Sequence, residues 1–115
     1  MIYRRSRTVT VEHNGVSWLF ERPPGSVLLG WGPRVAELAN PPEGAVMPVT
    51  VDNFRDMVGE LARWCTQIDG APCDYDAETL DSMLLPSDTI AVWAGFFAKC
   101  SMDDEARGKS EMPSD

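Results

Sequence analysis

The stretch from residue 64 to residue 88, WCTQIDGAPCDYDAETLDSMLLPSD, gathers residue types that bind metals or exchange protons. It holds two cysteines and six acids without any Lys or Arg: Cys65, Cys73, Asp69, Asp74, Asp76, Glu78, Asp81 and Asp88. Zinc sites built from Cys and His usually take their ligands in pairs roughly two to four residues apart. Here the cysteines are eight residues apart and His13 is the sole histidine. The spacing therefore predicts no zinc site.

Calcium is the second metal to consider, because Asp74, Asp76 and Glu78 alternate along the chain. A calcium loop of the EF-hand type that began at Asp74 would need glycine at its sixth position and glutamate at its twelfth. Thr79 and Leu85 occupy those positions. Asp76 explains the pattern without an ion if it caps a short helix. We expect neither a metal nor a cofactor.

Catalysis would require a nucleophile beside a base. His13 lies in a predicted turn, and the cysteines at positions 65, 73 and 100 are distant from it in sequence. Cys65 falls on an apolar stripe, where a thiol behaves as a small hydrophobic group. The phrase GSVLLGWG lacks the Lys-Ser/Thr that completes a phosphate-binding loop. We therefore predict that the protein is not an enzyme.

The charge is −8 and is unevenly distributed. Residues 1–22 carry four arginines and two glutamates, whereas residues 23–115 carry six bases and 16 acids. Such a body repels nucleic acid and anionic membranes and attracts basic partners. An odd cysteine count of three is typical of reduced thiols in a cytoplasm. The longest apolar run, IAVWAGFFA, is too short to cross a bilayer, so we expect a cytoplasmic protein without membrane contact.

The pattern of residues predicts one α+β domain over residues 1–102, built from an N-terminal β-hairpin and a small bundle of three to four helices, followed by a mobile acidic tail over 103–115. The hairpin centres on Asn14-Gly15, a dipeptide suited to a type I′ turn. A loop or broken turn should follow, and then a helix from about Pro33 to Asn40.

The strongest helical pattern covers residues 51–68. Its apolar residues recur at intervals of three and four: Val51, Phe54, Val58, Leu61, Cys65 and Ile68. Thr50 is the predicted N-cap, and Gly70 and Pro72 should end the helix. Gly59, inside the helix, is expected to mark a close contact. Two more helices are predicted, from Asp76 to Leu85 and from Ser87 to about Ser101.

The last helix is apolar on most sides, so it is either central to the core or part of an interface. Large or adaptable side chains on the helices are the candidates for binding a partner, with membership of the core as the alternative for each. These candidates are Met57, Trp64, Met83, Trp93, Phe96 and Phe97.

The order of these elements resembles that of the tail assembly chaperones of long-tailed bacteriophages, over about residues 8–105. The matching phrases are the strand end WLFERPPGS, the Trp-bearing helix FRDMVGELARWC, and IDGAPCDYDAETLDSMLLPSDTIAVW, followed by an acidic C-terminus. The family has no strict residue signature, so no binding residue is transferred by position.

The resemblance implies a non-catalytic protein that binds the tape measure protein and helps tail-tube protein polymerise around it. It also implies weak self-association, which would produce a homo-oligomer. Two other functions fit the same composition: a structural protein of the virion, in the tail or the head–tail connection, and an acidic inhibitor that mimics DNA.

Overall fold

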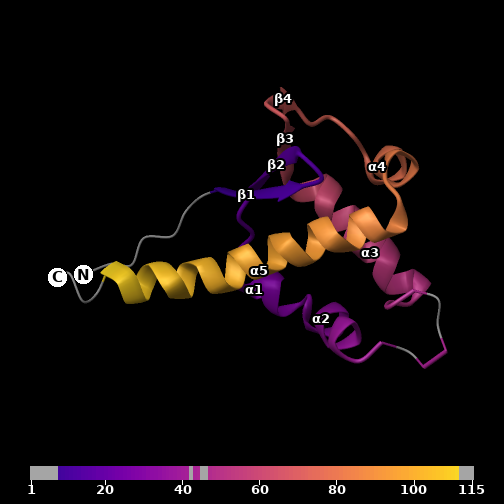
Figure 1. Ribbon diagram of the computed structural model, residues 1–115, viewed down its shortest axis with the longest axis horizontal. Helices are drawn as coiled ribbons and strands as arrows, with labels where there is room; N and C mark the ends of the chain where they lie inside the picture. Colours follow the sequence, from indigo (N-terminus) through magenta and orange to yellow (C-terminus); the bar gives the residue numbers. More distant parts are fainter. Residues whose placement is uncertain (1–7, 42, 45–46, 112–115) are drawn as a thin grey trace.

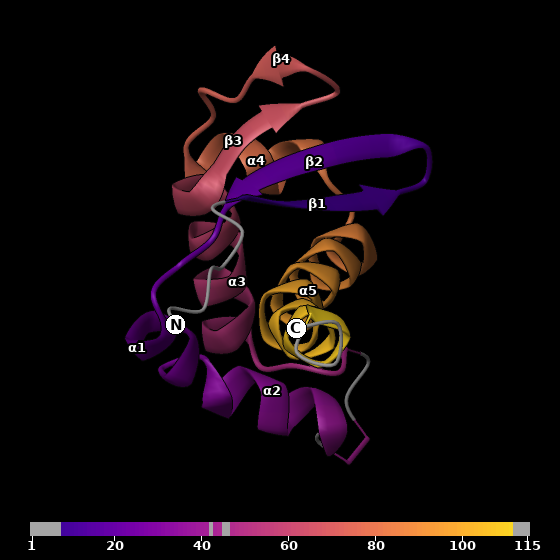
Figure 2. The same cartoon turned by 90° about the vertical axis from the view of Figure 1, so that its left-hand side faces the viewer.

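The computed structural model describes the backbone of residues 8–41, 43–44 and 47–111 and the side chains of these residues as far as Ser101. A four-stranded antiparallel sheet packs on a layer of helices (Figures 1 and 2). The strands, in sheet order, are β1 (Thr8–His13), β2 (Val16–Glu21), β3 (Cys65–Ile68) and β4 (Ala71–Pro72). The helices are α1 (Gly25–Leu29), α2 (Gly32–Ala39), α3 (Val51–Trp64), α4 (Ala77–Met83) and α5 (Pro86–Glu111).

Figure 2 shows the layers most clearly, with the sheet on one side, α3 and α5 beneath it, and α1 and α2 beyond them. The predicted fold class, an N-terminal hairpin followed by helices in an α+β domain, is confirmed. The first hairpin turns at Asn14 and Gly15, whose φ values of 51° and 79° are the positive angles that a type I′ turn requires.

The predicted helix over residues 51–68 is too long, because α3 ends at Trp64 and the chain continues as β3. Asp69 and Gly70 then form a second turn with positive φ values of 52° and 82°. This Asp-Gly pair makes a second hairpin, β3–β4, at the place where the exit of a helix was predicted. The backbone N–H of Asp69 donates to the Ser17 carbonyl at 2.7 Å, which ties the new hairpin to the first.

A β-bulge explains why the helical pattern appeared to continue into β3. Leu19 pairs with Gln67 and Phe20 pairs with Cys65, so Thr66 is the extra residue on its strand. The extra residue lets Cys65 and Ile68 face the same core although they are three positions apart. A spacing of three on one face imitates a helix, and the apolar pattern alone could not separate the two structures.

The predicted caps of the two middle helices are confirmed. The Thr50 hydroxyl accepts a hydrogen bond from the Asn53 backbone N–H at 3.3 Å, and the Asp76 carboxylate accepts one from the Thr79 N–H at 2.8 Å. The segment expected as a broken turn contains the short helix α1, and α2 follows with Pro33 in its first turn.

The last helix differs from its prediction at the C-terminal end. It begins one residue early, at Pro86, and continues to Glu111 rather than ending near Ser101. Most of the segment assigned to a tail is therefore helical. Val92, Trp93 and Phe96 are fully buried, so the part of α5 between residues 89 and 100 belongs to the core.

Stacked aromatic rings join the sheet to α5. The ring of Phe20 on β2 stacks on that of Phe96 with centroids 4.1 Å apart, and Trp31, between α1 and α2, lies 5.6 Å from both Trp93 and Phe96. Aromatic pairs at such distances add to the free energy of burial.

The close backbone approach predicted at Gly59 occurs instead at Gly95. A Cβ atom added to Gly59 would meet nothing within 4 Å, so that prediction is wrong. A Cβ atom added to Gly95 on α5 would lie 3.1 Å from Cγ1 of Val11 on β1. The missing side chain at Gly95 lets α5 pass close beneath the first strand.

Candidate functional site

The imidazole of His13 stands at the first hairpin turn and faces the start of α5. Its Nε2 lies 2.8 Å from Oδ1 of Asp88, and the Asn14 side-chain amide donates to the same oxygen at 3.3 Å. The cysteines lie in other parts of the fold: on β3, directly after β4, and within α5. The contact pairs the imidazole with a carboxylate rather than with a thiol, and it joins the hairpin to α5.

The Cys65 and Cys73 thiols lie next to each other on the core side of the β3–β4 hairpin. The backbone N–H of Cys73 donates to the Thr66 carbonyl at 2.9 Å, which brings the two cysteines together across the hairpin. Burial, and then the neighbouring Cys73 thiol, raises the pKa of Cys65. Within the described residues, no cluster of three or more His, Cys, Asp or Glu side chains could hold a metal ion.

Two acids of the 64–88 stretch serve the local backbone. Asp69 accepts a hydrogen bond from the Ser17 N–H at 2.8 Å, and Asp76 caps α4. Hydrogen bonds from the Thr79 side chain and backbone lower the pKa of Asp76. These carboxylates stabilise turns and helix ends and are not arranged for acid–base chemistry.

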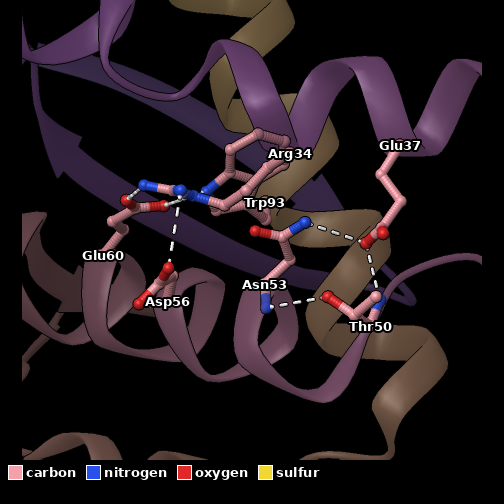
Figure 3. Close-up of polar contacts among 7 residues, drawn as sticks. All are labelled: Arg34, Glu37, Thr50, Asn53, Asp56, Glu60 and Trp93. Carbon is pink, nitrogen blue, oxygen red and sulfur yellow. Dashed lines mark hydrogen bonds and ion pairs between the residues drawn. The ribbon is translucent and has the colours of Figure 1, made fainter.

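A polar cluster, here called the α2–α3 clamp, fixes α2 against α3 and α5. It consists of Arg34, Glu37, Thr50, Asn53, Asp56, Glu60 and Trp93 (Figure 3). The Arg34 guanidinium forms a two-pronged ion pair with Glu60, with its Nε 2.9 Å from Oε1 and its NH2 group on Oε2. The Trp93 indole N–H donates to the same Oε1 at 2.8 Å. One carboxylate thus connects three helices.

The other end of the clamp holds the loop that leads into α3. Glu37 accepts hydrogen bonds from the Asn53 side chain, at 2.9 Å, and from the Thr50 backbone N–H (Figure 3). These two donors, the Asn53 side chain first, lower the pKa of Glu37. Because the polar groups of the clamp are engaged by one another, we interpret the clamp as structural.

The surface with the features of a binding site lies on the other side of α3. Two adjoining pockets of about 250 and 200 Å³ form the α3–α4 groove, and Phe54 lines both. The apolar lining residues are Met47, Val49, Val51, Phe54, Val58, Ala77 and Pro86. The polar lining residues are Thr50, Arg55, Glu78 and Asp81.

Large apolar side chains are exposed at the groove and on the chain that leads to it. Val51, in the first turn of α3, is 66% exposed, and Leu85, directly before Pro86, is also 66% exposed. Met83, at the end of α4, is 54% exposed. Such groups in contact with water mark a surface suited to binding another apolar surface.

The six residues predicted to bind a partner divide by burial. Met57, Trp93 and Phe96 are fully buried and pack in the core. Trp64 and Phe97 are half-buried, the first beneath the Arg63 guanidinium and the second stacked on Trp93. Met83 is exposed. The structure therefore does not bring the six together on one face.

Sequence reasoning missed the groove because three of its lining residues, Val51, Phe54 and Val58, lie on the same apolar stripe as the buried Leu61. Val51 and Phe54 both continue the spacing of the buried Val58 and Leu61. One signal was present, since Val51 directly follows the cap residue Thr50 and is therefore the outermost member of the stripe.

The surroundings of the groove are strongly acidic. Residues 51–85, which contain α3 and α4, hold eight acids and two arginines. Glu78 and Asp81 line the groove from α4. The groove thus combines an apolar floor with a negative rim, and Arg55 is the single base among its lining residues.

Comparisons with known proteins return no match, whether with family models, with curated proteins or with solved structures. In the described part of the chain, no helix has both the length and the apolar character needed to span a membrane.

Proposed function

We propose that the protein is a non-catalytic assembly chaperone that binds a helical client through the α3–α4 groove. The observation that carries this proposal is the groove itself: two adjoining apolar pockets whose lining includes the exposed Val51. Amphipathic helices bind in such grooves by placing apolar residues of one face into successive pockets. The resemblance to tail assembly chaperones makes the tape measure protein, a long helical chain, the proposed client, and phage tail assembly the proposed process.

The chemistry of the polar groups supports binding rather than catalysis. The imidazole of His13 is paired with Asp88, and Glu60 is engaged by Arg34 and Trp93. The Cys65 thiol is buried with a raised pKa, which disfavours the nucleophilic thiolate. These groups stabilise the fold that presents the groove.

A DNA mimic is a weaker alternative, because it needs a continuous stripe of free carboxylates. Glu37, Glu60, Asp76 and Asp88 are occupied by partners within the chain. Glu78 and Asp81 accompany apolar groups at the groove. A protein client that is apolar and basic suits this surface better than a mimic's basic target.

Co-expression with the tape measure protein tests the proposal. The client is expected to become more soluble and to co-purify with this chain. The double variant Val51→Ser/Leu85→Ser should weaken the complex, whereas Leu29→Ser, which removes a similarly apolar side chain that is 83% exposed on α1, should not. An insoluble client with no co-purifying complex would contradict the proposal.

Gene order provides an independent observation. A phage tail chaperone should be encoded between a major tail protein and a very long, predominantly helical reading frame. Absence of the chain from purified particles, checked by mass spectrometry, separates a chaperone from a structural protein of the virion.

A further inference from the structure

We infer that the α3–α4 groove selects a basic amphipathic helix, with apolar side chains in the two pockets and Lys or Arg side chains at Glu78 and Asp81. The inference rests on the proposed function, because it specifies the chemistry of the client at the same surface. It goes further in assigning selectivity to the charged rim rather than to the apolar floor.

The dimensions of the groove fit a helix. An apolar cavity of about 150 Å³ accommodates benzene, so pockets of about 250 and 200 Å³ each have room for one large apolar side chain. Val51 lines one pocket and Val58 the other, seven residues apart on α3, which corresponds to roughly 10 Å along the helix axis. Apolar residues four to seven positions apart on a client helix span roughly 6 to 10 Å and can enter both pockets.

The negative charge of the rim determines which charged side chains the client helix should carry beside its apolar stripe. Glu78 and Asp81 are three positions apart on α4, so they share one side of that helix and face the same groove. Arg55 is the single base among the residues that line the groove, so two carboxylates face one guanidinium there and the rim is negative. Cationic side chains that flank an apolar stripe of the client would meet these two carboxylates of α4.

Two occupants from this chain itself fit less well. A second copy would bring the same acidic rim to the groove, and like charges would face each other. The C-terminal segment 102–115 carries five acids and two bases, and its residues as far as Glu111 form the far end of α5. That helix has 26 residues and starts at Pro86, beside the groove, so its end lies roughly 38 Å away.

Synthetic helical peptides test the inference with the full-length chain. Three 18-residue peptides contain the same number of leucines. The first has lysines that flank the apolar stripe, the second has glutamates at those positions, and the third has the lysines but a scrambled order of leucines, so that no stripe forms. Fluorescence anisotropy would measure Kd at 50 and 300 mM NaCl. We expect the lysine peptide to bind at least tenfold more tightly than either of the others, and its affinity to fall several-fold at the higher salt concentration.

Charge-neutral variants locate the selectivity. Glu78→Gln/Asp81→Asn should weaken binding of the lysine peptide about fivefold, in proportion to two partly exposed ion pairs. The control Glu12→Gln/Glu21→Gln removes the same charge from exposed sites on the first hairpin and should change Kd less than twofold. Equal losses in both variants would assign the effect to net charge and would overturn the inference.

The basic segment 1–7, which has three arginines, is the alternative occupant of the groove. A chain that lacks residues 1–7 tests this alternative through its affinity for the lysine peptide. Unchanged peptide affinity supports an external partner, whereas a clear gain would show that the segment fills the groove and would overturn the inference. The outcome is separate from that of the co-expression test. Rim-dependent peptide binding without a tape measure complex would refute the proposed process alone, and a complex that ignores the rim would refute the inference alone.

Discussion

Replacement of Glu60 by alanine should destabilise the protein far more than replacement of Asp56, the other acid of the α2–α3 clamp that contacts Arg34. The carboxylate accepts hydrogen bonds from the Arg34 guanidinium and from the Trp93 indole. Glu60 and Arg34 side chains are only 14% and 12% exposed, and Trp93 is fully buried. The Glu60→Ala variant would therefore remove the acceptor of the Trp93 indole N–H and leave the Arg34 guanidinium only its longer contact with Asp56, at a site where little water can replace the carboxylate.

The magnitude follows from the burial of these groups. Breaking a fully buried ion pair costs about 3–5 kcal/mol, and breaking an exposed pair costs about 0–1 kcal/mol. The Arg34–Glu60 pair is largely buried, so its loss is assigned an intermediate cost of about 2 kcal/mol. An unsatisfied indole N–H adds about 1 kcal/mol. The sum is about 3 kcal/mol, which lowers the urea midpoint by roughly 1.5 M if the m value is about 2 kcal/mol/M.

Asp56 provides a matched control on the same helix. Its carboxylate lies 3.6 Å from the same guanidinium, but its side chain is 58% exposed. Asp56→Ala should cost less than about 0.5 kcal/mol, because solvent already screens that pair. Equilibrium urea unfolding followed by tryptophan fluorescence and by circular dichroism would measure both variants.

A double-mutant cycle with Trp93→Phe isolates the shared hydrogen bond. Trp93→Phe removes the donor, so it should cost less in the Glu60→Ala background than in the native chain, with a coupling of about 1 kcal/mol. A midpoint for Glu60→Ala within 0.3 M of that for Asp56→Ala, a shift far below the roughly 1.5 M expected, would refute this account of the clamp. Additive costs in the cycle would refute the indole contact.

Gly59→Ala should stabilise α3 by about 1 kcal/mol, because the added Cβ meets open space. Gly95→Leu should destabilise the fold, because its side chain meets Val11. Thermal unfolding would compare the Tm of the two variants with that of the native chain. Cys65, whose pKa burial raises, should react with iodoacetamide at pH 8 much more slowly in the native than in the urea-unfolded chain, as peptide mass spectrometry would report. The lowered pKa of Asp76 means that its contribution is present above its ordinary value of 3.8 and is lost as the pH falls through its lower folded value. Asp76→Asn should therefore flatten the decline of Tm between pH 4.5 and pH 2.5, and an identical slope in the two proteins would count against this assignment.

The sequence predicted the elements that depend on local chemistry. Asn14-Gly15 determined the first hairpin, and Thr50 and Asp76 determined the starts of α3 and α4. The same local rule applied to Asp69-Gly70 would have predicted the second hairpin. It was overlooked because the bulge in β3 keeps Cys65 in a helical spacing, and pairing with β2, a contact distant in sequence, decides the structure there.

The candidate site was less predictable, since exposure depends on how far neighbouring elements extend. The apolar stripe of α3 includes Val51 and Leu61 alike, yet Leu61 is fully buried and Val51 is 66% exposed. Nothing in the residue types distinguishes them. The difference arises because α4 has only seven residues and leaves the groove open along the first two turns of α3.

The two sides of α3 have complementary roles in presenting the groove. Asn53, Asp56 and Glu60 recur at intervals of three and four and face α2, where the clamp holds them. Val51 and Phe54 lie on the side that lines the pockets. A helix fixed from one side presents its other side in a preformed arrangement, so a client loses little free energy to ordering of the groove. In the proposed function, the buried polar contacts of this chain and its exposed apolar surface therefore act together to offer a client a firm surface.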